Sequence, residues 1–463
     1  MHAYTMRSSG SLEAAHYQSM EQPRSRRLRT CTLLNLLLVV WVDFLDRAIF
    51  TLVAQPIKED LNLSDTQLGS LVTAFTLFEA LAIPPISLLV ERSSDRRRPL
   101  VVAMLVWTLF SALSGAAQSY EQLLACRVMV GVGEATVAPI AMPLLADLYG
   151  AHERSTPFGV YLGGTFLGTF LGNTLGGLVA SLSSWRLAFV LVSSPGLLVA
   201  ASVFARVVDP RTEPGGGPPK VGGAPPQLGS TLRALWAVDG LPGVLVAVAL
   251  QSAANLGVWA FLAPYLQRAH GLTTAQAGAV LALTNGIAPF LALVAGGVAT
   301  DAIAARTSAS SRQWVLLLLP TLSLPTSLLF MAVFLRVDAA HTAAAAAALC
   351  AWVMLSQLSS PAVSSVVMEL APQGTRSIAF SVSVLFSAVG IGSGALLVGA
   401  LSDAFGPDGL APAMGVANAA LGLLSTAVYV ALVLRLASLG GSAAGRASTP
   451  REQGVRTVHG ALL

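Results

Sequence analysis

The stretch CRVMVGVGEATVAPIAMPLLADLYGAHER, residues 126–154, decides the fold of this chain. It is a long apolar run that contains two charged residues, Arg127 and Glu134. Charges at the depth of a bilayer are costly and rare, so each one is a hypothesis about function. Gly131 and Gly133 lie between them and let another helix or a substrate approach closely. The stretch therefore predicts a membrane-spanning helix that carries part of a functional site.

Composition excludes an ordinary soluble protein. Of the 463 residues, 54% are hydrophobic and 11% are charged, whereas soluble proteins carry about 25% charged residues. Apolar runs of roughly 20 residues, each long enough to cross a bilayer, recur between Leu33 and Leu439. The first 30 residues are polar and rich in arginine, which does not indicate a cleavable signal peptide. The three cysteines have no paired spacing and are expected to be packing residues.

The pattern predicts an all-α membrane protein with twelve transmembrane helices in two six-helix bundles. A Pro/Gly-rich stretch, EPGGGPPKVGGAPPQ, separates the two sets and predicts a flexible linker. The expected spans lie near 31–56, 67–90, 99–118, 122–148, 157–182, 186–207, 241–267, 274–300, 314–336, 342–370, 375–401 and 411–437. The expected domains are a basic tail 1–30, an N-terminal bundle 31–207, a linker 208–240, a C-terminal bundle 241–439 and a tail 440–463.

The positions of the basic residues predict the orientation in the membrane. Of 27 lysines and arginines, two lie inside spans and four lie in or beside the loops that follow odd-numbered spans. These four are Lys58, Arg186, Arg268 and Arg336. Because cytoplasmic loops carry the excess of positive charge, both termini are expected to be cytoplasmic.

An internal repeat supports the two-bundle arrangement. Every third span closes with a small residue followed four positions later by an acid or a polar residue. The pairs are Ser87/Glu91, Gly177/Ser181, Gly297/Asp301 and Gly399/Asp403. Recurrence at every third span is expected of nested three-helix repeats.

Two motifs resemble those of the major facilitator superfamily. The loop SLLVERSSDRRR is similar to its signature G-x-L-x-D-R-x-x-R-R, with Ser87 in place of glycine and Glu91 in place of aspartate. The fifth span is similar to G-x3-G-P-x2-G-G, with Asn173 in place of proline. The resemblance implies a monomer in which two bundles rock about a central site.

Two further stretches resemble the spinster branch of that superfamily. RVMVGVGEATVAPIAMPLLADLY matches the pattern R-x3-G-x-G-E-A followed by an aspartate at the end of the span. The first span and the following loop resemble N-[YF]-x-D-R and S-D-x-Q-x-G, except that Asp43 stands where the branch usually has asparagine. The matching residues are Asp46, Arg47, Ser64, Asp65, Gln67 and Gly69. This resemblance implies a substrate of the lysophospholipid or sphingosine-phosphate type.

Charged residues inside the expected spans lie only in the first half of the chain. They are Asp43, Asp46, Arg47, Glu79, Arg127 and Glu134. Asp43 and Arg47 lie four residues apart on one helix and are expected to form an ion pair, and Arg127 is expected at a membrane depth similar to that of Asp46. The second half offers Gln251, Asn255, Asn285, Gln357 and Asn418 among apolar residues. This asymmetry would suit an amphipathic substrate, with its charged head against one bundle and its apolar body against the other.

Proton coupling is predicted from the chemistry of these charges. Burial raises the pKa of a carboxyl group and a neighbouring arginine lowers it, so a movable arginine can switch an acid between binding and releasing a proton. We expect Asp46, Glu134 and Asp43 to take part in proton coupling. Arginine presents a planar fork that suits carboxylate or phosphate, so the expected substrate-binding residues are Arg47, Arg127, Glu134 and Glu79. The competing interpretation is that these ion pairs only hold helices together.

Gating is predicted for two further groups. In the basic loop, Glu91, Arg92 and Arg96 are expected to form a latch with Asp147 at the end of the fourth span; the alternative is a signal that retains the loop in the cytoplasm. Gly168, Gly172 and Gly176 form a ladder that predicts either a moving helix interface or static close packing.

The sequence thus predicts a secondary active transporter that works by alternating access. It is expected to be proton-coupled and to move an amphipathic organic anion or a lysolipid. One alternative is an organic-anion or drug exporter of another facilitator branch, and another is a receptor or scaffold that keeps the fold without transport. The expected partners are a small-molecule or lipid substrate, protons and the bilayer. No cofactor, metal, nucleic acid or enzymatic activity is predicted.

Overall fold

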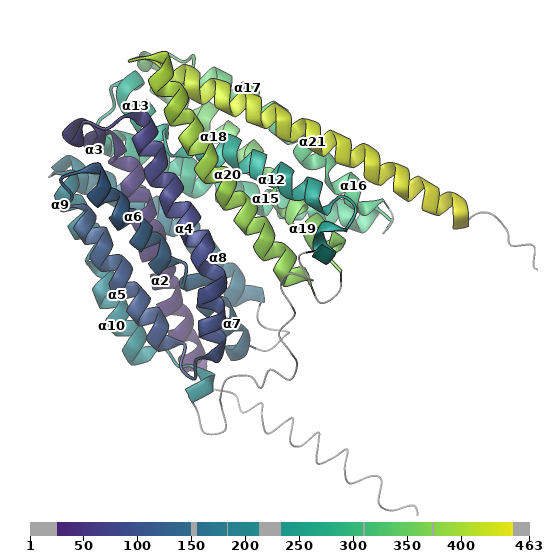
Figure 1. Ribbon diagram of the computed structural model, residues 1–463, viewed down its shortest axis with the longest axis horizontal. Coiled ribbons are helices and arrows are strands. Elements are labelled where there is room, and N and C mark those ends of the chain that lie inside the picture. Colours follow the sequence, from purple (N-terminus) through teal and green to yellow (C-terminus); the bar gives the residue numbers. More distant parts are fainter. Residues whose placement is uncertain are drawn as a thin grey trace, which may run out of the picture. The chain divides into compact units, whose positions relative to one another are not determined.

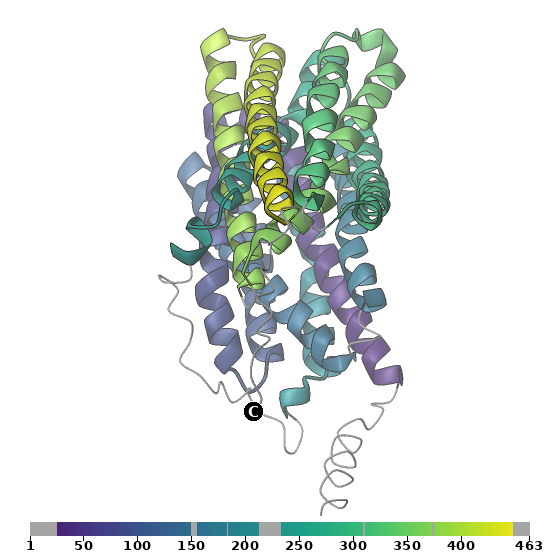
Figure 2. The same ribbon diagram turned by 90° about the vertical axis from the view of Figure 1, so that its right-hand side faces the viewer.

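The computed structural model describes residues 26–149, 155–182, 184–212, 233–308, 311–372 and 375–447, and these residues form helices and no strand. The predicted all-α fold is confirmed. Most of the predicted tails, and residues 213–232 of the predicted linker, lie outside the described residues. The helices are shown in Figures 1 and 2.

Each expected span corresponds to one helix or to consecutive helices. In the first half these are α2 (Arg26–Leu52) with α3 (Ala54–Leu61), α4 (Asp65–Arg92), α5 (Arg97–Ser114), α6 (Tyr120–Glu134) with α7 (Val137–Leu148), α8 (Ser155–Leu182), and α9 (Trp185–Ser193) with α10 (Pro195–Arg206), followed by the short η1 (Pro210–Thr212).

In the second half each expected span is likewise one helix or several consecutive helices, most of which are labelled in Figure 1. Its elements are α12 (Leu241–Trp259) with α13 (Leu262–His270), α14 (Thr274–Leu281) with the π-helical turn η2 (Ala282–Ile287) and α15 (Ala288–Arg306), α16 (Arg312–Leu316) with α17 (Leu318–Phe334), η3 (Ala339–His341) and α18 (Thr342–Leu358) with α19 (Ser360–Leu370), α20 (Arg376–Phe405), and the long α21 (Leu410–Ala447).

The first helix of each expected three-helix repeat is broken. The breaks separate α2 from α3, α6 from α7, α12 from α13 and α18 from α19. Each is followed closely by a proline, namely Pro56, Pro139, Pro264 or Pro361. A proline lacks the amide hydrogen that would bond the carbonyl four residues earlier, and its ring clashes with that carbonyl. In all four cases that carbonyl belongs to a residue in the break or within two residues of it.

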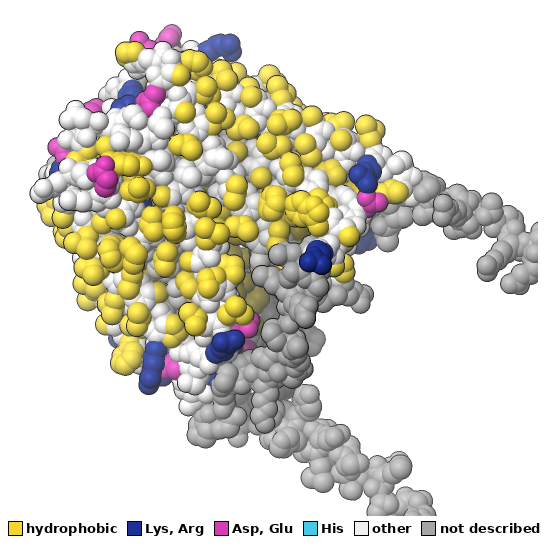
Figure 3. Space-filling model, viewed as in Figure 1, with side chains coloured by type: hydrophobic (Ala, Val, Ile, Leu, Met, Phe, Trp, Pro, Cys, Tyr) yellow, Lys and Arg dark blue, Asp and Glu magenta, His cyan; other side chains and the backbone are white. Residues whose placement is uncertain are grey.

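Eleven of the described helical segments are long and apolar enough to cross a membrane. The α2 segment is not among them, and its apolar run contains three charged residues, Asp43, Asp46 and Arg47. Large hydrophobic side chains such as Leu182 and Leu198 are exposed, and hydrophobic side chains cover much of the face in Figure 3. Such a surface is expected where helices contact lipid.

The described residues fall into two compact units. The first unit comprises the helices up to η1 together with Trp259–Ile287 and Ala395–Leu410; the second comprises the described residues of Ala224–Val258, Ala288–Gly394 and Ala411–Leu463. The chain therefore passes from the second unit to the first at the end of α12, next to the break before α13. The predicted division into bundles at 208–240 stays a prediction.

Each unit has its own core. In the first unit Trp107 and Leu144 are fully buried, and in the second Leu245 and Tyr429 are almost fully buried. Both described ends of the predicted linker pack on these units. Asp209 is buried in the first unit and Leu235 in the second.

Candidate functional site

The glycines of the fourth span bring α6 against two neighbouring helices. A Cβ at Gly131 would lie 2.6 Å from the carbonyl oxygen of Phe75 on α4, and one at Gly133 would lie 2.8 Å from the Cβ of Trp107 on α5. Only glycine allows this approach. It places Glu134, the last residue of α6, close to the charged side chains of α2 and α4.

Arg47 lies at the centre of this charged cluster. Its Nε donates to Asp43 at 2.8 Å, which confirms the ion pair expected from their spacing on one helix. Its Nη1 and Nη2 donate to the two carboxylate oxygens of Glu79 at 3.0 and 2.6 Å. This paired geometry is the strongest form of contact between arginine and a carboxylate.

Glu134 is the third carboxylate at Arg47. Its Oε2 lies 3.0 Å from Nε of Arg47, an ion-pair distance. The hydrogen on that nitrogen is directed to Asp43, so neither oxygen of Glu134 has a hydrogen-bond partner among the described residues. The Glu134 side chain is fully buried, whereas those of Arg47 and Glu79 are 27% and 19% exposed. The Arg47–Glu79 pair is thus the accessible end of the cluster.

Arg127 lies apart from these contacts. Its guanidinium carbon is 4.8 Å from the ring centre of Phe50 and 5.8 Å from those of Phe75 and Phe189. Its Nε and Nη2 have no hydrogen-bond partner within the described part of the chain. The side chain is almost fully buried. Three aromatic faces therefore surround this cation where carboxylates were expected.

Asp46 is the most isolated acid of the set. It is fully buried on α2, and Ser193 donates to its Oδ1 over 3.3 Å. Its Oδ2 has no partner among the described residues. Ser193 also donates to Ser111 at 2.8 Å, so this acid lies in a small hydroxyl network. The structure thus brings Asp43, Arg47, Glu79 and Glu134 into contact, whereas Asp46 and Arg127 form no ion pair with any residue that the structure describes.

The glycine ladder of α8 positions α2. A Cβ at Gly168 would lie 3.0 Å from the Cβ of Phe44, one at Gly172 would lie 2.9 Å from Cα of Leu45, and one at Gly176 would lie 2.7 Å from Cδ1 of Ile49. The ladder therefore lets α8 pack closely against the segment of α2 that carries the charged residues.

The basic loop after α4 forms a buried ion pair. Arg96 donates to Asp147 at 2.7 Å, the partner expected from the sequence, and its Nε and Nη2 also contact Asp209 after α10. The side chains of Arg96 and Asp209 are both fully buried. Glu91 and Arg92 are exposed and make no ion pair with any described residue. Of the predicted latch residues, only Arg96 and Asp147 meet.

A second charged cluster within the first unit was not predicted as a site. Asp65 accepts from Lys58 at 2.6 Å, from both Nη atoms of Arg268 at 2.7 and 2.8 Å, and from Ser402 at 2.6 Å. Asp403 accepts from the backbone amides of Asp65 and Thr66 at 2.9 and 2.8 Å. We call these residues the Asp65 cluster.

The S-D-x-Q-x-G motif was the available signal for the Asp65 cluster. Ser64 and Gln67 form a capping box at the start of α4. Gly69 is required because a Cβ there would lie 2.4 Å from the carbonyl oxygen of Ala395. The partners Arg268 and Asp403 are 203 and 338 residues away from Asp65, so the motif alone does not identify them.

The amides of the second half do not lie among apolar side chains only. Gln251, Asn255 and Gln357 line a pocket of about 270 Å³ within the second unit. Asn418 lies behind this pocket and donates to Asn255, whereas Asn285 lies in η2 of the first unit. At this pocket, hydroxyl and amide groups therefore lie beside apolar side chains such as Val384 and Phe380.

Comparison with known proteins establishes the family. Residues 36–395 match the Major Facilitator Superfamily, and the chain belongs to this family of membrane transporters. An MFS-type efflux pump of Mycolicibacterium smegmatis is 29% identical over 389 residues, which cover 82% of this chain and 86% of that protein. A probable L-galactonate transporter of Escherichia coli is 27% identical over 177 residues, which cover 38% of this chain and 39% of that protein.

Among solved structures, a bacterial homologue of the human lysosomal transporter Spinster, in an inward-facing and unoccupied conformation, has a TM-score of 0.71. It is 24% identical and covers 91% of this chain and 98% of that one. This likeness shows the shared fold and agrees with the resemblance in the first and fourth spans. The protein is a multi-pass membrane protein with the facilitator fold.

Proposed function

We propose that the protein is a secondary transporter that couples the movement of an organic anion to protons by alternating access. The observation that carries the proposal is the contact of one accessible arginine, Arg47, with three carboxylates, Asp43, Glu79 and Glu134.

The charges of the site do not balance. Asp43, Asp46, Glu79 and Glu134 are four carboxyl groups, and Arg47 and Arg127 are two guanidinium groups. Burying uncompensated negative charge is costly, and carboxyl groups in such surroundings take up protons instead. We infer that the resting site holds at least one proton, which is the coupling ion of the transporter.

The accessible Arg47–Glu79 pair supports an exchange between proton and substrate. When Glu79 is ionised it occupies the paired donors of Arg47. A proton on Glu79 removes that charge and weakens the contact, so an incoming carboxylate or phosphate can take its place on the guanidinium fork. Proton and anion would then bind together, which favours symport.

Arg127 supports the switching of buried acids. Electrostatic interactions link it to Glu134 and to Asp46, yet it forms no ion pair with either among the described residues. The aromatic rings hold the cation without neutralising it. A small shift toward either acid would favour release of its proton, and a shift away would favour uptake.

Two substrate classes are supported by different observations. The resemblance of the first and fourth spans to the spinster branch favours a lysolipid, whereas the relative named as a probable L-galactonate transporter favours a sugar acid. Export of an organic anion or drug remains the alternative suggested by the efflux-pump relative. A receptor without transport would not require the unbalanced charges around Arg47.

Two latches are assigned to gating. The Arg96–Asp147 pair lies at one end of the membrane helices. The distribution of basic residues predicts that this end, like both termini, is cytoplasmic. The Asp65 cluster lies at the other end of α4 and joins it to α13 and α20. We propose that Arg96 and Asp147 gate the inner side, that the Asp65 cluster gates the outer side, and that the glycine ladder of α8 is a moving interface.

The test is uptake into proteoliposomes with an imposed pH gradient. The probes are L-galactonate and oleoyl lysophosphatidylcholine, and an entrapped pH dye reports proton flux. Glu79→Gln and Glu134→Gln are each expected to abolish the pH dependence of uptake. The control Glu121→Gln removes an exposed carboxylate on the same helix as Glu134 and should leave uptake unchanged. Uptake that keeps its pH dependence in both site variants would overturn the proposal.

A further inference from the structure

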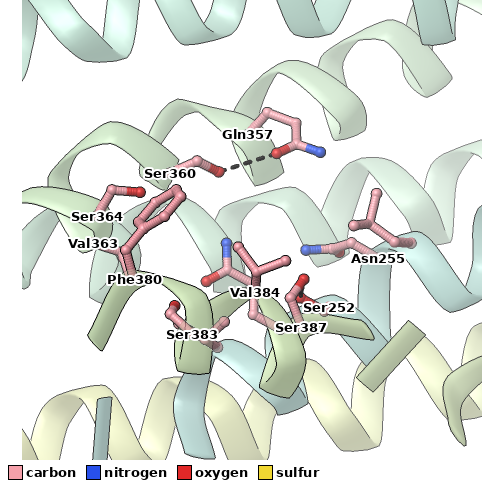
Figure 4. Close-up of a pocket in the computed structure, with 13 residues that line it drawn as sticks. Ser252, Asn255, Gln357, Ser360, Val363, Ser364, Phe380, Ser383, Val384 and Ser387 are labelled. Atoms are coloured by element: carbon pink, nitrogen blue, oxygen red, sulfur yellow. Dashed lines mark hydrogen bonds between the residues drawn. The ribbon is translucent and has the colours of Figure 1, made fainter. Parts of the chain in front are cut away.

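The pocket of about 270 Å³ in the second unit contains no charged residue. Eight of its thirteen lining residues are serine, asparagine or glutamine, and five are apolar. They come from α12, from α18 with α19, and from α20, and their side chains point into one space in Figure 4. We call this space the serine–amide pocket.

Contacts within the wall fix some of these polar groups. Tyr429 donates to Oε1 of Gln251 at 2.9 Å, and Nε2 of Gln251 donates to the carbonyl oxygen of Ser356 at 3.2 Å. Ser252 and Ser387 are hydrogen-bonded to each other at 2.7 Å. These contacts hold α12, α18, α20 and α21 together and leave those groups with less capacity for a ligand.

Other polar groups of the pocket keep unused hydrogen-bonding capacity. Asn255 is 4% exposed, and its Oδ1 accepts from Asn418 at 3.4 Å, which leaves Nδ2 directed into the pocket (Figure 4). Within the described part of the chain, Nδ2 of Asn255 and the hydroxyls of Ser364 and Ser383 have no hydrogen-bond partner. Gln357 accepts from Ser360 at 3.0 Å through its oxygen, so its amide nitrogen is also available.

These features specify the chemistry of a ligand. With no cation in the wall, a carboxylate or phosphate would lose its hydration without compensation. An alkyl chain would displace water from the amide and hydroxyl groups of the pocket without replacing its hydrogen bonds, which is also costly. A neutral group with many hydroxyls can donate to and accept from serine, asparagine and glutamine. The half-exposed ring of Phe380 offers an apolar surface to the carbon skeleton of such a group.

The size of the pocket agrees with a small ligand. Pockets for small molecules typically hold ~300–1,000 Å³, and this one has a volume of about 270 Å³. We propose that the serine–amide pocket binds an uncharged, polyhydroxylated group of the sugar or polyol type. If the proposed function holds, the transported anion is then a hydroxylated organic acid.

Binding of neutral probes tests the pocket apart from proton coupling. The neutral probes galactitol and D-galactose, and the anion L-galactonate for comparison, are titrated against purified protein in detergent, and thermal stabilisation reports affinity. Ser383→Ala and Asn255→Leu are each expected to weaken binding about 3- to 10-fold, because each removes a hydrogen bond to a neutral ligand. Ser393→Ala on α20 is the control, because its hydroxyl donates to the carbonyl oxygen of Gly390 and the residue does not line the pocket. Ser364→Ala serves as a further probe if Asn255→Leu fails to fold.

The outcomes separate this inference from the proposed function. Stabilisation by neutral probes that is lost in Ser383→Ala and kept in Ser393→Ala supports the pocket, whatever the pH dependence of transport. Stabilisation by lysophosphatidylcholine alone would overturn it, as would the absence of any effect of the three sugar-type probes. Proton-coupled uptake of galactonate that is unaffected by all pocket variants would overturn the pocket and leave the proposed function standing.

Discussion

The buried pair formed by Arg96 and Asp209 makes a quantitative prediction about stability. Asp209 accepts from the backbone amide of Arg96 at 2.7 Å, from its Nη2 at 2.7 Å, from its Nε at 3.1 and 3.2 Å, and from the amide of Arg211 at 3.1 Å. Both paired side chains are fully buried. Asp209→Asn removes the negative charge and leaves the guanidinium with Asp147 alone.

Removing one partner of a buried ion pair costs ~3–5 kcal/mol. Asparagine keeps one acceptor oxygen, so we expect Asp209→Asn to destabilise the protein by ~3 kcal/mol, at the lower end of that range. The control is Asp147→Asn. The Asp147 side chain is 46% exposed, and a partly exposed pair contributes no more than about 1 kcal/mol. Thermal unfolding in detergent, followed by loss of the monodisperse peak, should show a clearly larger fall in the apparent midpoint for Asp209→Asn than for Asp147→Asn.

The same pair predicts a pH dependence. Burial alone would raise the pKa of Asp209, but hydrogen bonds from Arg96 and Arg211 outweigh it and hold the pKa below its usual value. A depressed pKa means that the contribution is fully present above the unfolded value, about 3.9, and is lost as the pH falls through the folded value. The stability difference between the wild type and Asp209→Asn should therefore be constant near neutral pH and shrink below about pH 4. Equal effects of the Asp209 and Asp147 substitutions would refute this reasoning.

The other contacts of the first unit give two further predictions. Gly172→Val should lower both thermal stability and uptake, because the side chain would meet Leu45 and Ala48 and displace the charged segment of α2. The matched control is Gly159→Val, on the same helix with open space around it, and equal losses in both variants would refute the close approach. Arg268→Gln should open the Asp65 cluster and raise the labelling, by a membrane-impermeant reagent, of a cysteine introduced at Thr66. The control is Arg336→Gln, which should not raise the labelling because Arg336 makes no ion pair with a described residue. Unchanged labelling in Arg268→Gln would contradict a gating role for the cluster.

Local features of the sequence predicted the helices and part of the site. Apolar runs predicted the membrane helices, and the spacing of Asp43 and Arg47 on one helix predicted their ion pair. The helix breaks were not predicted, although Pro56, Pro139, Pro264 and Pro361 were visible. The positions of the prolines alone would not have predicted the breaks, because Pro84, Pro85 and Pro325 lie inside the unbroken helices α4 and α17.

Contacts between distant segments were the part that the sequence did not provide. The paired contact of Arg47 with Glu79 depends on how α2 meets α4, which helical periodicity does not specify. The aromatic surroundings of Arg127 come from Phe50, Phe75 and Phe189 on three different helices. From its expected depth in the membrane, Arg127 was predicted to lie near carboxylates. Side-chain packing alone determines which group it contacts.

The break between α12 and α13 has a mechanical consequence. A continuous ladder of hydrogen bonds keeps one helix axis, whereas the proline after this break interrupts the ladder and makes a joint between two axes. Because the chain leaves the second unit at this joint, α13 and its Arg268 belong to the first unit although their sequence continues from α12. A tilt of α12 would thus reach the Asp65 cluster only through this joint. The force needed to separate the residues of the cluster would depend on their ion pairs more than on the stiffness of the helix.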